Sequence, residues 1–330
     1  MVWKWISASD SIRQRPLRVG HLVFVGGQVT TVKMQKIKIV EVAPRDGLQN
    51  ETVTVPTGAK ADFVDALSDT GVSEIEVSAF VSQKWVPQLG DAEDLFQRIT
   101  RKDGVIYSAL VPNEKGLDRA IQSGVDKVSV FTAVSETFNQ KNINTSVEGS
   151  IGRFKPLVQR AAKIGLPVRG YVSTAFWCAF EGKMAPKAVV RVLERLFEIG
   201  VDEVSVSDTI GKASPQEVET LLEHLLPIIP PERVAMHFHD TYGNGVANVL
   251  ASRAFGIGIF DASAGGLGGC PFAPGATGNV STESVVSALE ARGEVTGVDL
   301  LKLMRAGRVL DPYLAPKRQT MPPANSLACT

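Results

Sequence analysis

The chain has 330 residues, of which 44% are hydrophobic and 21% are charged, with 35 basic and 35 acidic side chains and zero formal net charge. A balanced charge gives no sign of nucleic-acid or membrane-surface binding, and no apolar run reaches the ~18 residues that cross a bilayer. Three widely spaced cysteines argue against a disulfide framework and favour a reducing compartment. We therefore expect a cytoplasmic protein with neither a nucleic-acid nor a membrane partner.

Residues 1–35 differ in composition from the rest of the chain. They hold five basic residues but only one acid, Asp10. This bias is typical of a targeting segment, which would place the protein in the mitochondrial matrix. An upstream extension of the reading frame is the other interpretation, because Met34 directly precedes the first clear strand. Residues 23–32 suit a short β-ribbon, and we expect residues 1–35 to lie outside the catalytic core.

A repeating unit begins at residue 36. Each copy runs from a helix through a glycine and a short link into a strand rich in β-branched residues. The glycines stand where a helix C-cap glycine belongs, at Gly71, Gly124, Gly165, Gly200 and Gly256. Short apolar strands that alternate with helices indicate parallel strands joined by crossover helices.

Eight such strands are predicted, at residues 37–42, 75–79, 106–111, 128–132, 168–174, 204–208, 234–239 and 259–262. Helices fill the gaps, for example at residues 57–69, 186–199 and 215–226. Eight βα units in this length favour a (β/α)8 TIM barrel. An open doubly wound sheet is the alternative, but the sequence after the first strand is not a phosphate loop. The barrel domain is predicted to span residues 36–310 and to include an extra helix at 300–309, and the Pro-rich tail 311–330 is predicted to be mobile.

Polar residues gather where the predicted strands end. In TIM barrels the catalytic groups come from the C-terminal ends of the strands. These ends carry Arg45 and Asp46 after the first strand, Glu76 in the second, Asp208 and Thr209 after the sixth, and His237 and His239 in the seventh. Such groups have no evident packing purpose, because barrel interiors are otherwise filled by branched apolar side chains.

His237 and His239 form the most informative pair. Residues i and i+2 of a strand point to the same face, so both imidazoles are predicted to enter the barrel mouth. Together with the Asp46 carboxylate they make a ligand set for a divalent cation. Mg²⁺ or Mn²⁺ suits mixed imidazole and oxygen ligands, and Zn²⁺ also fits two histidines and a carboxylate. For an isolated pair, two histidines bonded only to buried neighbours would be the plainer interpretation. Here two of the four histidines of the chain lie beside carboxylates on other strand ends, which favours the metal site.

Arg45 and Asp46 are adjacent and would diverge on a regular strand. At a strand end followed by Gly47, both side chains can still line the mouth. A surface ion pair is the ordinary role of an arginine such as Arg45. For Glu76 the ordinary role is a salt bridge to Arg45 inside the barrel, which would also orient the guanidinium.

The last strand runs into a glycine-rich stretch, GGLGGCPFAPGATGNVSTE, at residues 265–283. Ordering such a loop costs entropy and buries little, so we expect a functional role in presenting the thiol of Cys270. A long turn with an incidental cysteine is the alternative. Ser281 or Thr282 is predicted to cap the helix that follows, with Glu283 in its first turn.

Five motifs together resemble hydroxymethylglutaryl-CoA lyase, a branch of the metal-dependent lyase and Claisen-condensing barrels. They are VEVAPRDGLQNE at residues 40–51, SAFVSQKWVPQLGD at 78–91, SVSDTIG at 205–211, HFHDTYGNGVAN at 237–248 and the glycine–cysteine stretch at 265–283. The resemblance spans about residues 36–310. The related isopropylmalate and homocitrate synthases share the Arg-Asp and His-x-His elements but lack the glycine–cysteine loop.

The resemblance implies a retro-Claisen cleavage of 3-hydroxy-3-methylglutaryl-CoA into acetoacetate and acetyl-CoA, with an acyl-CoA substrate and a homo-oligomeric, dimeric enzyme. It implies Mg²⁺ or Mn²⁺ bound by Asp46, His237, His239 and Asn279. It further implies that Arg45 binds substrate and stabilises the enolate, that Asp46 or His237 is the base, and that Cys270 gives a proton. Substrate contacts are implied for Glu76, Asp208 and Thr209.

Three positions depart from the family pattern. Thr52 stands where many members have lysine, and Trp177 and Ala179 replace the glycine and proline that usually flank the cysteine at position 178. A tryptophan at the end of the fifth strand would reshape the acyl pocket, so a lyase for citramalyl-CoA or for a longer branched 3-hydroxyglutaryl-CoA is the second hypothesis. A non-catalytic barrel that binds metal or CoA is the third.

Overall fold

The structure is a computed structural model that describes residues 22–25, 28–31, 36–268 and 278–314. The chain divides into two compact units, Met1–Lys36 and Ile37–Thr330. In the first unit β1 (Leu22–Val25) pairs antiparallel with β2 (Gln28–Thr31), which confirms the predicted β-ribbon. The tail predicted to be mobile spans residues 311–330. Its residues after position 314 lie outside the described ranges, so its mobility stays a prediction.

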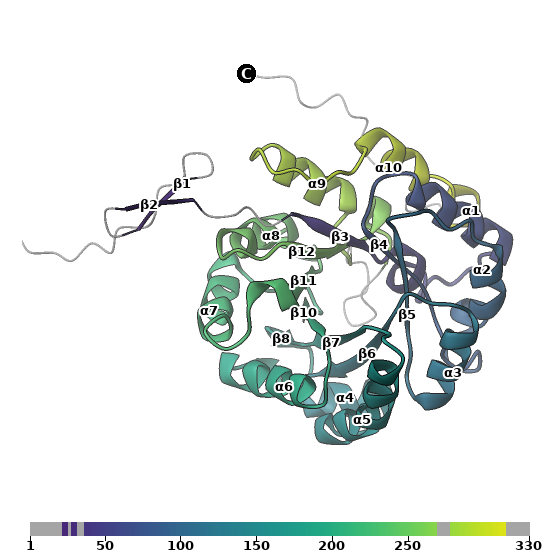
Figure 1. Cartoon of the computed structure of the whole chain (residues 1–330), viewed down its shortest axis with the longest axis horizontal. Coiled ribbons are helices and arrows are strands. Elements are labelled where there is room, and N and C mark those ends of the chain that lie inside the picture. The colour runs from purple at the N-terminus through teal and green to yellow at the C-terminus, as the bar shows by residue number, and fades with distance from the viewer. Residues whose placement is uncertain (1–21, 26–27, 32–35, 269–277, 315–330) are drawn as a thin grey trace, which may run out of the picture. The chain divides into compact units, whose positions relative to one another are not determined.

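Eight parallel strands close into a barrel, as Figure 1 shows. The pairing of β12 with β3 joins the last strand to the first, which excludes the open-sheet alternative. All eight predicted strands are confirmed, with ends that shift by at most one residue. In chain order they are β3 (Lys38–Glu41), β4 (Glu74–Ala79), β5 (Ile106–Leu110), β6 (Lys127–Ala133), β7 (Val168–Ser173), β10 (Glu203–Asp208), β11 (Val234–Phe238) and β12 (Ile259–Ala262).

Helices surround the barrel (Figure 1). They are α1 (Thr57–Ser68), α2 (Ala92–Arg98), α3 (Glu114–Gln122), α4 (Glu136–Ile143), α5 (Val147–Lys163), α6 (Pro186–Glu198), α7 (Pro215–Leu225), α8 (Gly245–Ala254), α9 (Thr282–Glu290) and α10 (Leu300–Ala306). The predicted extra helix is α10, and Ser281 caps α9 by accepting a hydrogen bond from the Ser284 amide. None of the helices in these described ranges is long and apolar enough to cross a membrane.

Helix α7 illustrates why the sequence folds this way. Ser214 and Glu217 form a reciprocal capping box around Pro215 at the first helical position, which satisfies free amides at the helix start. Four apolar side chains at helical spacing then bury one face: Val218, Leu221, Leu222 and Leu225. Each buried leucine contributes about 1.5–3 kcal/mol of hydrophobic stabilisation.

The predicted C-cap glycines all adopt a positive φ, which L-residues with side chains rarely take. The angles are 90° at Gly71, 69° at Gly124, 69° at Gly165, 102° at Gly200 and 91° at Gly256. Gly71 also has no room for a side chain, because an added Cβ would lie 2.2 Å from the carbonyl oxygen of Gly297. The repeating unit seen in the sequence is therefore a repeating backbone turn.

The base of the barrel interior is ionic, which differs from the expected filling of branched apolar side chains. Glu74 lies 2.6 Å from the Lys38 ammonium and 3.1 Å from that of Lys127. Arg169 lies 2.8 Å from Glu203 and 2.8 Å from Asp261. Buried charges are tolerated when each is paired, and here inward-facing charges from several strands pair with one another. This network connects the base of the barrel to the layer beneath the mouth.

Candidate active site

The site begins at an irregular turn after β3. Residues Ala43–Gly47 form one π-helical turn, in which the amides of Arg45, Asp46 and Gly47 all donate to the carbonyl of Val42 at 3.2, 2.8 and 3.1 Å. Single π-turns occur frequently at functional sites. The turn removes the alternation of a strand, so two adjacent side chains reach the mouth together, with Arg45 Nη1 2.6 Å from Asp46 Oδ1.

Gly47 allows this turn to approach the segment after β12. A Cβ built at Gly47 would lie 3.1 Å from the Leu267 carbonyl oxygen and 3.1 Å from Ser263 Oγ. Backbone cannot yield as a flexible side chain does, so a larger residue here would push the two segments apart. The glycine thereby keeps Asp46 close to the residues that follow β12.

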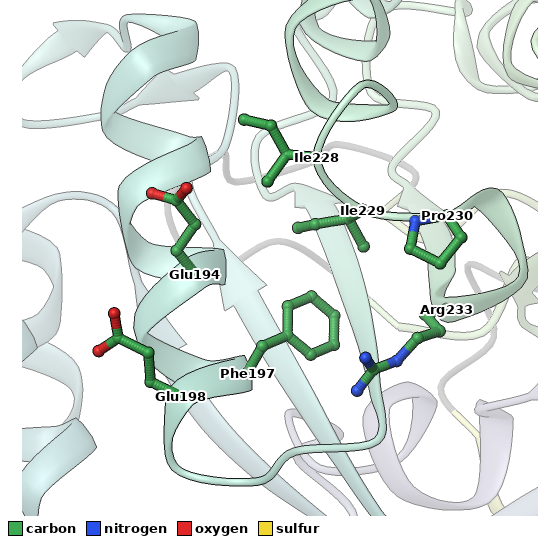
Figure 2. A pocket seen from close by; sticks show the side chains of 7 residues that line it. All are labelled: Glu194, Phe197, Glu198, Ile228, Ile229, Pro230 and Arg233. Atoms are coloured by element: carbon green, nitrogen blue, oxygen red, sulfur yellow. The ribbon is translucent and has the colours of Figure 1, made fainter.

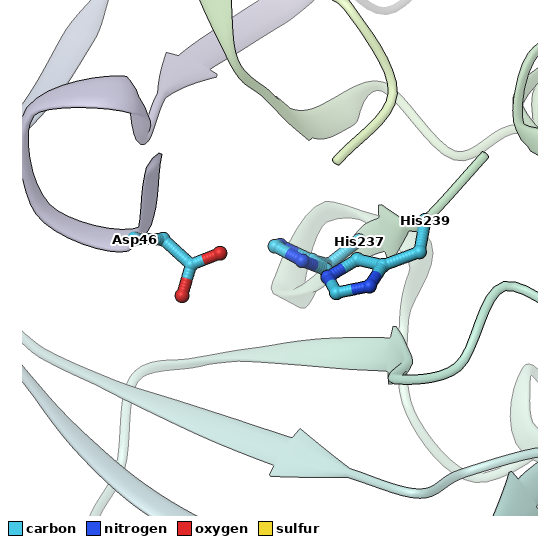
Figure 3. A group of neighbouring side chains, drawn as sticks. All are labelled: Asp46, His237 and His239. Atoms are coloured by element: carbon cyan, nitrogen blue, oxygen red, sulfur yellow. The ribbon is translucent and has the colours of Figure 1, made fainter. Parts of the chain in front are cut away.

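Three candidate metal ligands come together at the mouth. One ligand atom each from Asp46, His237 and His239 lies within 4.8 Å of the others, and Figure 3 shows the carboxylate facing the two imidazoles. The two rings have centroids 5.3 Å apart. The predicted same-face arrangement is confirmed, although β11 ends at Phe238 and His239 pairs with Asn279 in an isolated bridge.

Asn279 joins this group. Its Nδ2 donates to Asp46 Oδ2 at 2.9 Å and to the Leu267 carbonyl at 3.1 Å. Its Oδ1 and the Nδ1 of His239 are buried and have no hydrogen-bond partner within the described part of the chain. Buried polar atoms without a partner are costly, and a cation would satisfy both. The donor set of one carboxylate, two imidazoles and one amide oxygen therefore fits a divalent metal.

The protonation of two of these groups, His239 and Asp46, also suits a cation. Burial, aided by the nearby His237, lowers the pKa of His239 to about 4, so its ring is neutral at neutral pH. Burial alone would raise the pKa of Asp46, but Arg45 and the two imidazoles more than offset it and the pKa is lowered. Metal ligands must be deprotonated, and both groups meet that condition.

His237 is held by a carboxylate that the sequence patterns did not single out. Its Nδ1 lies 3.4 Å from Oδ2 of Asp261, and this oxygen accepts a hydrogen bond from Ser205 Oγ at 2.6 Å. Burial lowers the pKa of His237, but the carboxylates of Asp261 and Asp46 outweigh it and the pKa is raised. The sequence did carry a signal for Asp261, because it is the one charged residue in the otherwise apolar strand β12 (Ile259–Ala262). A charged residue in such a strand indicates a side chain that faces the barrel interior.

Arg45 is fixed from two sides. Its Nε lies 2.5 Å from Glu76 Oε2, and its guanidinium carbon lies 5.1 Å from the centroid of the Tyr171 ring. The salt bridge predicted for Glu76 is confirmed, whereas the surface role for Arg45 is wrong, because only 6% of the residue is exposed. Nε and Nη1 are bound to carboxylates, so among the described residues Nη2 is the nitrogen left to meet a substrate.

Asp208 and Thr209 lie at the end of β10, where they bind backbone. The Asp208 carboxylate accepts from the amides of Lys212 and Ala213 at 3.2 and 2.9 Å, and burial raises its pKa to about 6. Thr209 Oγ1 accepts from the amide of Thr174 at 2.7 Å. Both residues thus order the loops beside the site, and their contact with substrate stays a prediction.

Cys270 lies outside the described residues, so its role rests on the sequence.

A separate pocket of about 360 Å³, shown in Figure 2, is lined by Glu194, Phe197, Glu198, Ile228, Ile229, Pro230 and Arg233. These residues end α6 or precede β11, so the pocket lies at the N-terminal end of the barrel. The candidate chemistry is at the opposite end.

Comparisons with known proteins agree with this geometry. The HMGL-like family matches residues 36–310. A cytoplasmic 3-hydroxy-3-methylglutaryl-CoA lyase of Rattus norvegicus is 48% identical over 82% of this chain and 79% of its own length. A mitochondrial hydroxymethylglutaryl-CoA lyase of Gallus gallus is 43% identical over 89% of this chain and 98% of its own.

Solved structures are also similar. The HMG-CoA lyase of Brucella melitensis has a TM-score of 0.83 and 46% identity, covering 84% of this chain and 98% of that one. An HMG-CoA lyase of Acinetobacter baumannii in complex with coenzyme A and 3-methylmalate has a TM-score of 0.81 and 39% identity, covering 86% of this chain and 93% of that one. Fold and sequence therefore agree over the whole barrel.

Proposed function

The chain belongs to the HMGL-like family, and we propose that it is a divalent-metal-dependent lyase that cleaves 3-hydroxy-3-methylglutaryl-CoA into acetoacetate and acetyl-CoA. The observation that carries the proposal is the group of Asp46, His237, His239 and Asn279 beside the buried guanidinium of Arg45. In a TIM barrel this is the end at which catalysis takes place.

Asp46, His237, His239 and Asn279 would hold the metal, Mg²⁺ or Mn²⁺, with Zn²⁺ as the alternative. When bound, a divalent cation supplies Lewis acidity that lowers the pKa of the C3 hydroxyl of the substrate. The orphaned Asn279 Oδ1 and His239 Nδ1 support this ligand set. Asp261, beside Nδ1 of His237, would help to fix the orientation of this ring.

In the reaction the C3 hydroxyl loses its proton as the C2–C3 bond breaks. The C3–O bond becomes the ketone of acetoacetate, and the electron pair of the broken bond passes to C2 and the thioester oxygen as an enolate. Asp46 or His237 would accept the hydroxyl proton, since both lie at the metal group. The enolate then takes a proton at C2 and leaves as acetyl-CoA.

Arg45 would stabilise the enolate oxygen through its Nη2 group. Its other nitrogens are held by Glu76 and Asp46, so the fork is oriented before substrate binds. Such preorganised donors aimed at developing charge are a large source of catalytic stabilisation. Glu76 thus acts on the substrate through Arg45, while Asp208 and Thr209 would order the adjacent loops that contact the acyl group.

Cys270 would give the proton that ends the reaction at C2. This proposal rests on the sequence match of the glycine–cysteine stretch. A thiol has a reference pKa of about 8.5, which makes it a suitable acid toward a carbon base. In this assignment Cys270 is an acid and forms no acyl intermediate.

A related 3-hydroxyacyl-CoA is the second candidate substrate, and Trp177 is the residue that favours it. Trp177 lies in a hairpin of β8 (Trp177–Cys178) and β9 (Gly182–Lys183), with its indole N–H donating to Glu217 at 3.2 Å. The Lys212 ammonium lies 3.8 Å from the centroid of the indole ring. This group follows β7 and β10 at the mouth end, where it can select the size and charge of the acyl chain.

The test is acetyl-CoA release from 3-hydroxy-3-methylglutaryl-CoA, citramalyl-CoA and a longer branched analogue, with and without Mg²⁺. We expect the first substrate to have the highest kcat/KM and to require the cation. Preference for another substrate that reverts in Trp177→Gly would establish the second candidate. Metal binding without turnover of any acyl-CoA would instead establish a non-catalytic barrel.

We also propose that residues 36–310 form the catalytic domain and that the enzyme is a cytoplasmic homodimer. Relatives carry both cytoplasmic and mitochondrial names, so the location is tested by fractionating cells that express the full chain. Light scattering of the purified protein measures the oligomeric state. Removal of residues 1–35 should leave kcat/KM unchanged if that segment lies outside the catalytic core.

A further inference from the structure

Glu41 is a fully buried carboxyl group that the proposed mechanism does not use. It is the last residue of β3, and its exposed fraction is 0%. Its Oε1 accepts hydrogen bonds from the amides of Ala43 and Ala264, both at 2.9 Å. Its Oε2 pairs with Thr282 Oγ1 at 2.8 Å. One side chain therefore joins the turn that follows β3 to two positions 223 and 241 residues further along the chain.

Each of these positions controls a part of the candidate metal site. Ala43 begins the π-turn that carries Asp46. Ala264 begins the segment whose Leu267 carbonyl accepts from Asn279 Nδ2. Thr282 lies three residues after Asn279 and is the first residue of α9. Glu41 thus ties the segment that holds Asp46 to both sides of the segment that holds Asn279.

We propose that Glu41 is a positioning residue that sets the distance between the metal ligands Asp46 and Asn279 without contacting metal or substrate. The inference rests on the proposed metal site. Outer partners of metal ligands commonly change metal affinity by about 10- to 100-fold when they are removed. Glu41 differs from such a partner in that it contacts two backbone amides and the Thr282 hydroxyl and none of the ligand side chains, so it fixes the ligand segments rather than single ligands.

The contacts need no negative charge. Two amides donate to a single oxygen, and the other oxygen meets a hydroxyl that can donate or accept. A glutamine can reproduce this pattern, because its carbonyl accepts both amides and its NH₂ donates to Thr282 Oγ1. Burial raises the pKa of Glu41 to about 8, which agrees with a neutral acid at neutral pH. Glutamine is therefore the conservative variant and alanine the disruptive one.

The experiment is a Mn²⁺ titration of the full-length protein, followed by electron paramagnetic resonance of the free ion, with a melting curve for each variant. We expect Glu41→Gln to bind Mn²⁺ nearly as the wild type does and Glu41→Ala to bind about 10- to 100-fold more weakly. Thr282→Val removes one of the three contacts and should weaken binding about fivefold, which corresponds to one ordinary hydrogen bond. It also preserves the test if Glu41→Ala does not fold.

Leu222→Ala is the matched control, because it creates a cavity beneath α7 and lowers the melting temperature without touching the tied segments. It should keep wild-type Mn²⁺ affinity. Wild-type affinity in both Glu41→Ala and Thr282→Val, or equal loss in Glu41→Gln and Glu41→Ala, would overturn the proposal. Absence of Mn²⁺ binding by the wild type would overturn it together with the metal site, whereas binding without lyase turnover would contradict only the proposed function.

Discussion

At the scale of single residues, Arg45 shows how one side chain is prepared for one task. Its guanidinium lies over Tyr171, and two of its three nitrogens are held by Glu76 and Asp46. Tyr171 Oη donates in turn to Glu76 at 3.1 Å. The entropy of orienting the fork is thus lost during folding and not during catalysis. The adjacency of Arg45 and Asp46 was readable in the sequence, but their mutual contact required the π-turn.

Arg45→Lys should lower kcat by about a hundredfold or more, although the charge is kept. A lysine has a single donor group and cannot bind two carboxylates in a plane while it presents a third nitrogen to the substrate. Steady-state kinetics at saturating Mg²⁺ measure the effect. Arg160→Lys, at an ion pair with Asp118, is the matched control and should leave kcat unchanged. Near wild-type turnover of the Arg45 variant would remove it from the mechanism.

Cys270→Ala should bind Mn²⁺ and CoA almost normally while turnover falls by orders of magnitude. Cys270→Ser should be nearly as slow, because a hydroxyl is a much weaker acid than a thiol of pKa about 8.5. Thiol alkylation should inactivate the enzyme, with protection by substrate. Cys329→Ala is the control and should retain full activity. A fast Cys270→Ala enzyme would move the search for the proton donor to Asp208, His237 or water.

The buried carboxyl group of Glu41 should make the free energy of unfolding depend on pH. The folded protein keeps its proton up to a pKa of about 8, while an unfolded glutamate releases it near 4.5. The stabilisation linked to that proton is present at low pH and is lost as pH rises through this window. The free energy of unfolding of the wild type, compared with Glu41→Gln, should therefore fall between those values. Denaturant titrations across the window measure it, and a constant or rising difference would mean that the carboxyl is ionised when folded.

At the scale of elements, the strands and helices were predictable because each carries a local signal. The capping box of α7 and the positive-φ glycines are set by neighbouring residues in the chain. The π-turn was not predictable, since its geometry depends on the close passage of Gly47 beside Leu267, more than two hundred residues later. The end of β11 before His239 likewise depends on the bridge to Asn279.

Gly47→Ala tests the importance of that passage. The added methyl group would crowd the Leu267 carbonyl and Ser263 and move the π-turn away from Asn279. We expect Mn²⁺ affinity and kcat/KM to fall at least as much as for loss of an outer ligand partner, about tenfold. Gly152→Ala is the control, because an added Cβ at that position in α5 would have no atom within 4 Å apart from the nearby backbone of its own helix. The control should keep its activity and gain about 0.5–1 kcal/mol of stability from the helix propensity of alanine. Wild-type Mn²⁺ affinity and kcat/KM in Gly47→Ala would show that the π-turn tolerates displacement.

At the scale of the whole molecule, the barrel fold and most residues at its mouth could be predicted from the sequence. The ion-pair network in the barrel interior could not. Strand ends identify a common edge, so His237, His239 and Asp46 could be grouped by their positions at those ends. The ionic base could not, because partners such as Lys38, Glu74 and Arg169 come from strands whose register and inward face are fixed only on closure. Asp261 escaped prediction for the same reason, since it connects this network to His237.

The central claim is that the four mouth residues bind a divalent cation on which cleavage depends. The most direct measurement is the rate of acetyl-CoA release by the EDTA-treated and dialysed enzyme before and after Mg²⁺ or Mn²⁺ is returned. We predict loss of activity without metal, recovery on its return, and no recovery in His239→Ala, whose missing imidazole opens the ligand set. Full activity of thoroughly metal-free wild-type enzyme would contradict the claim.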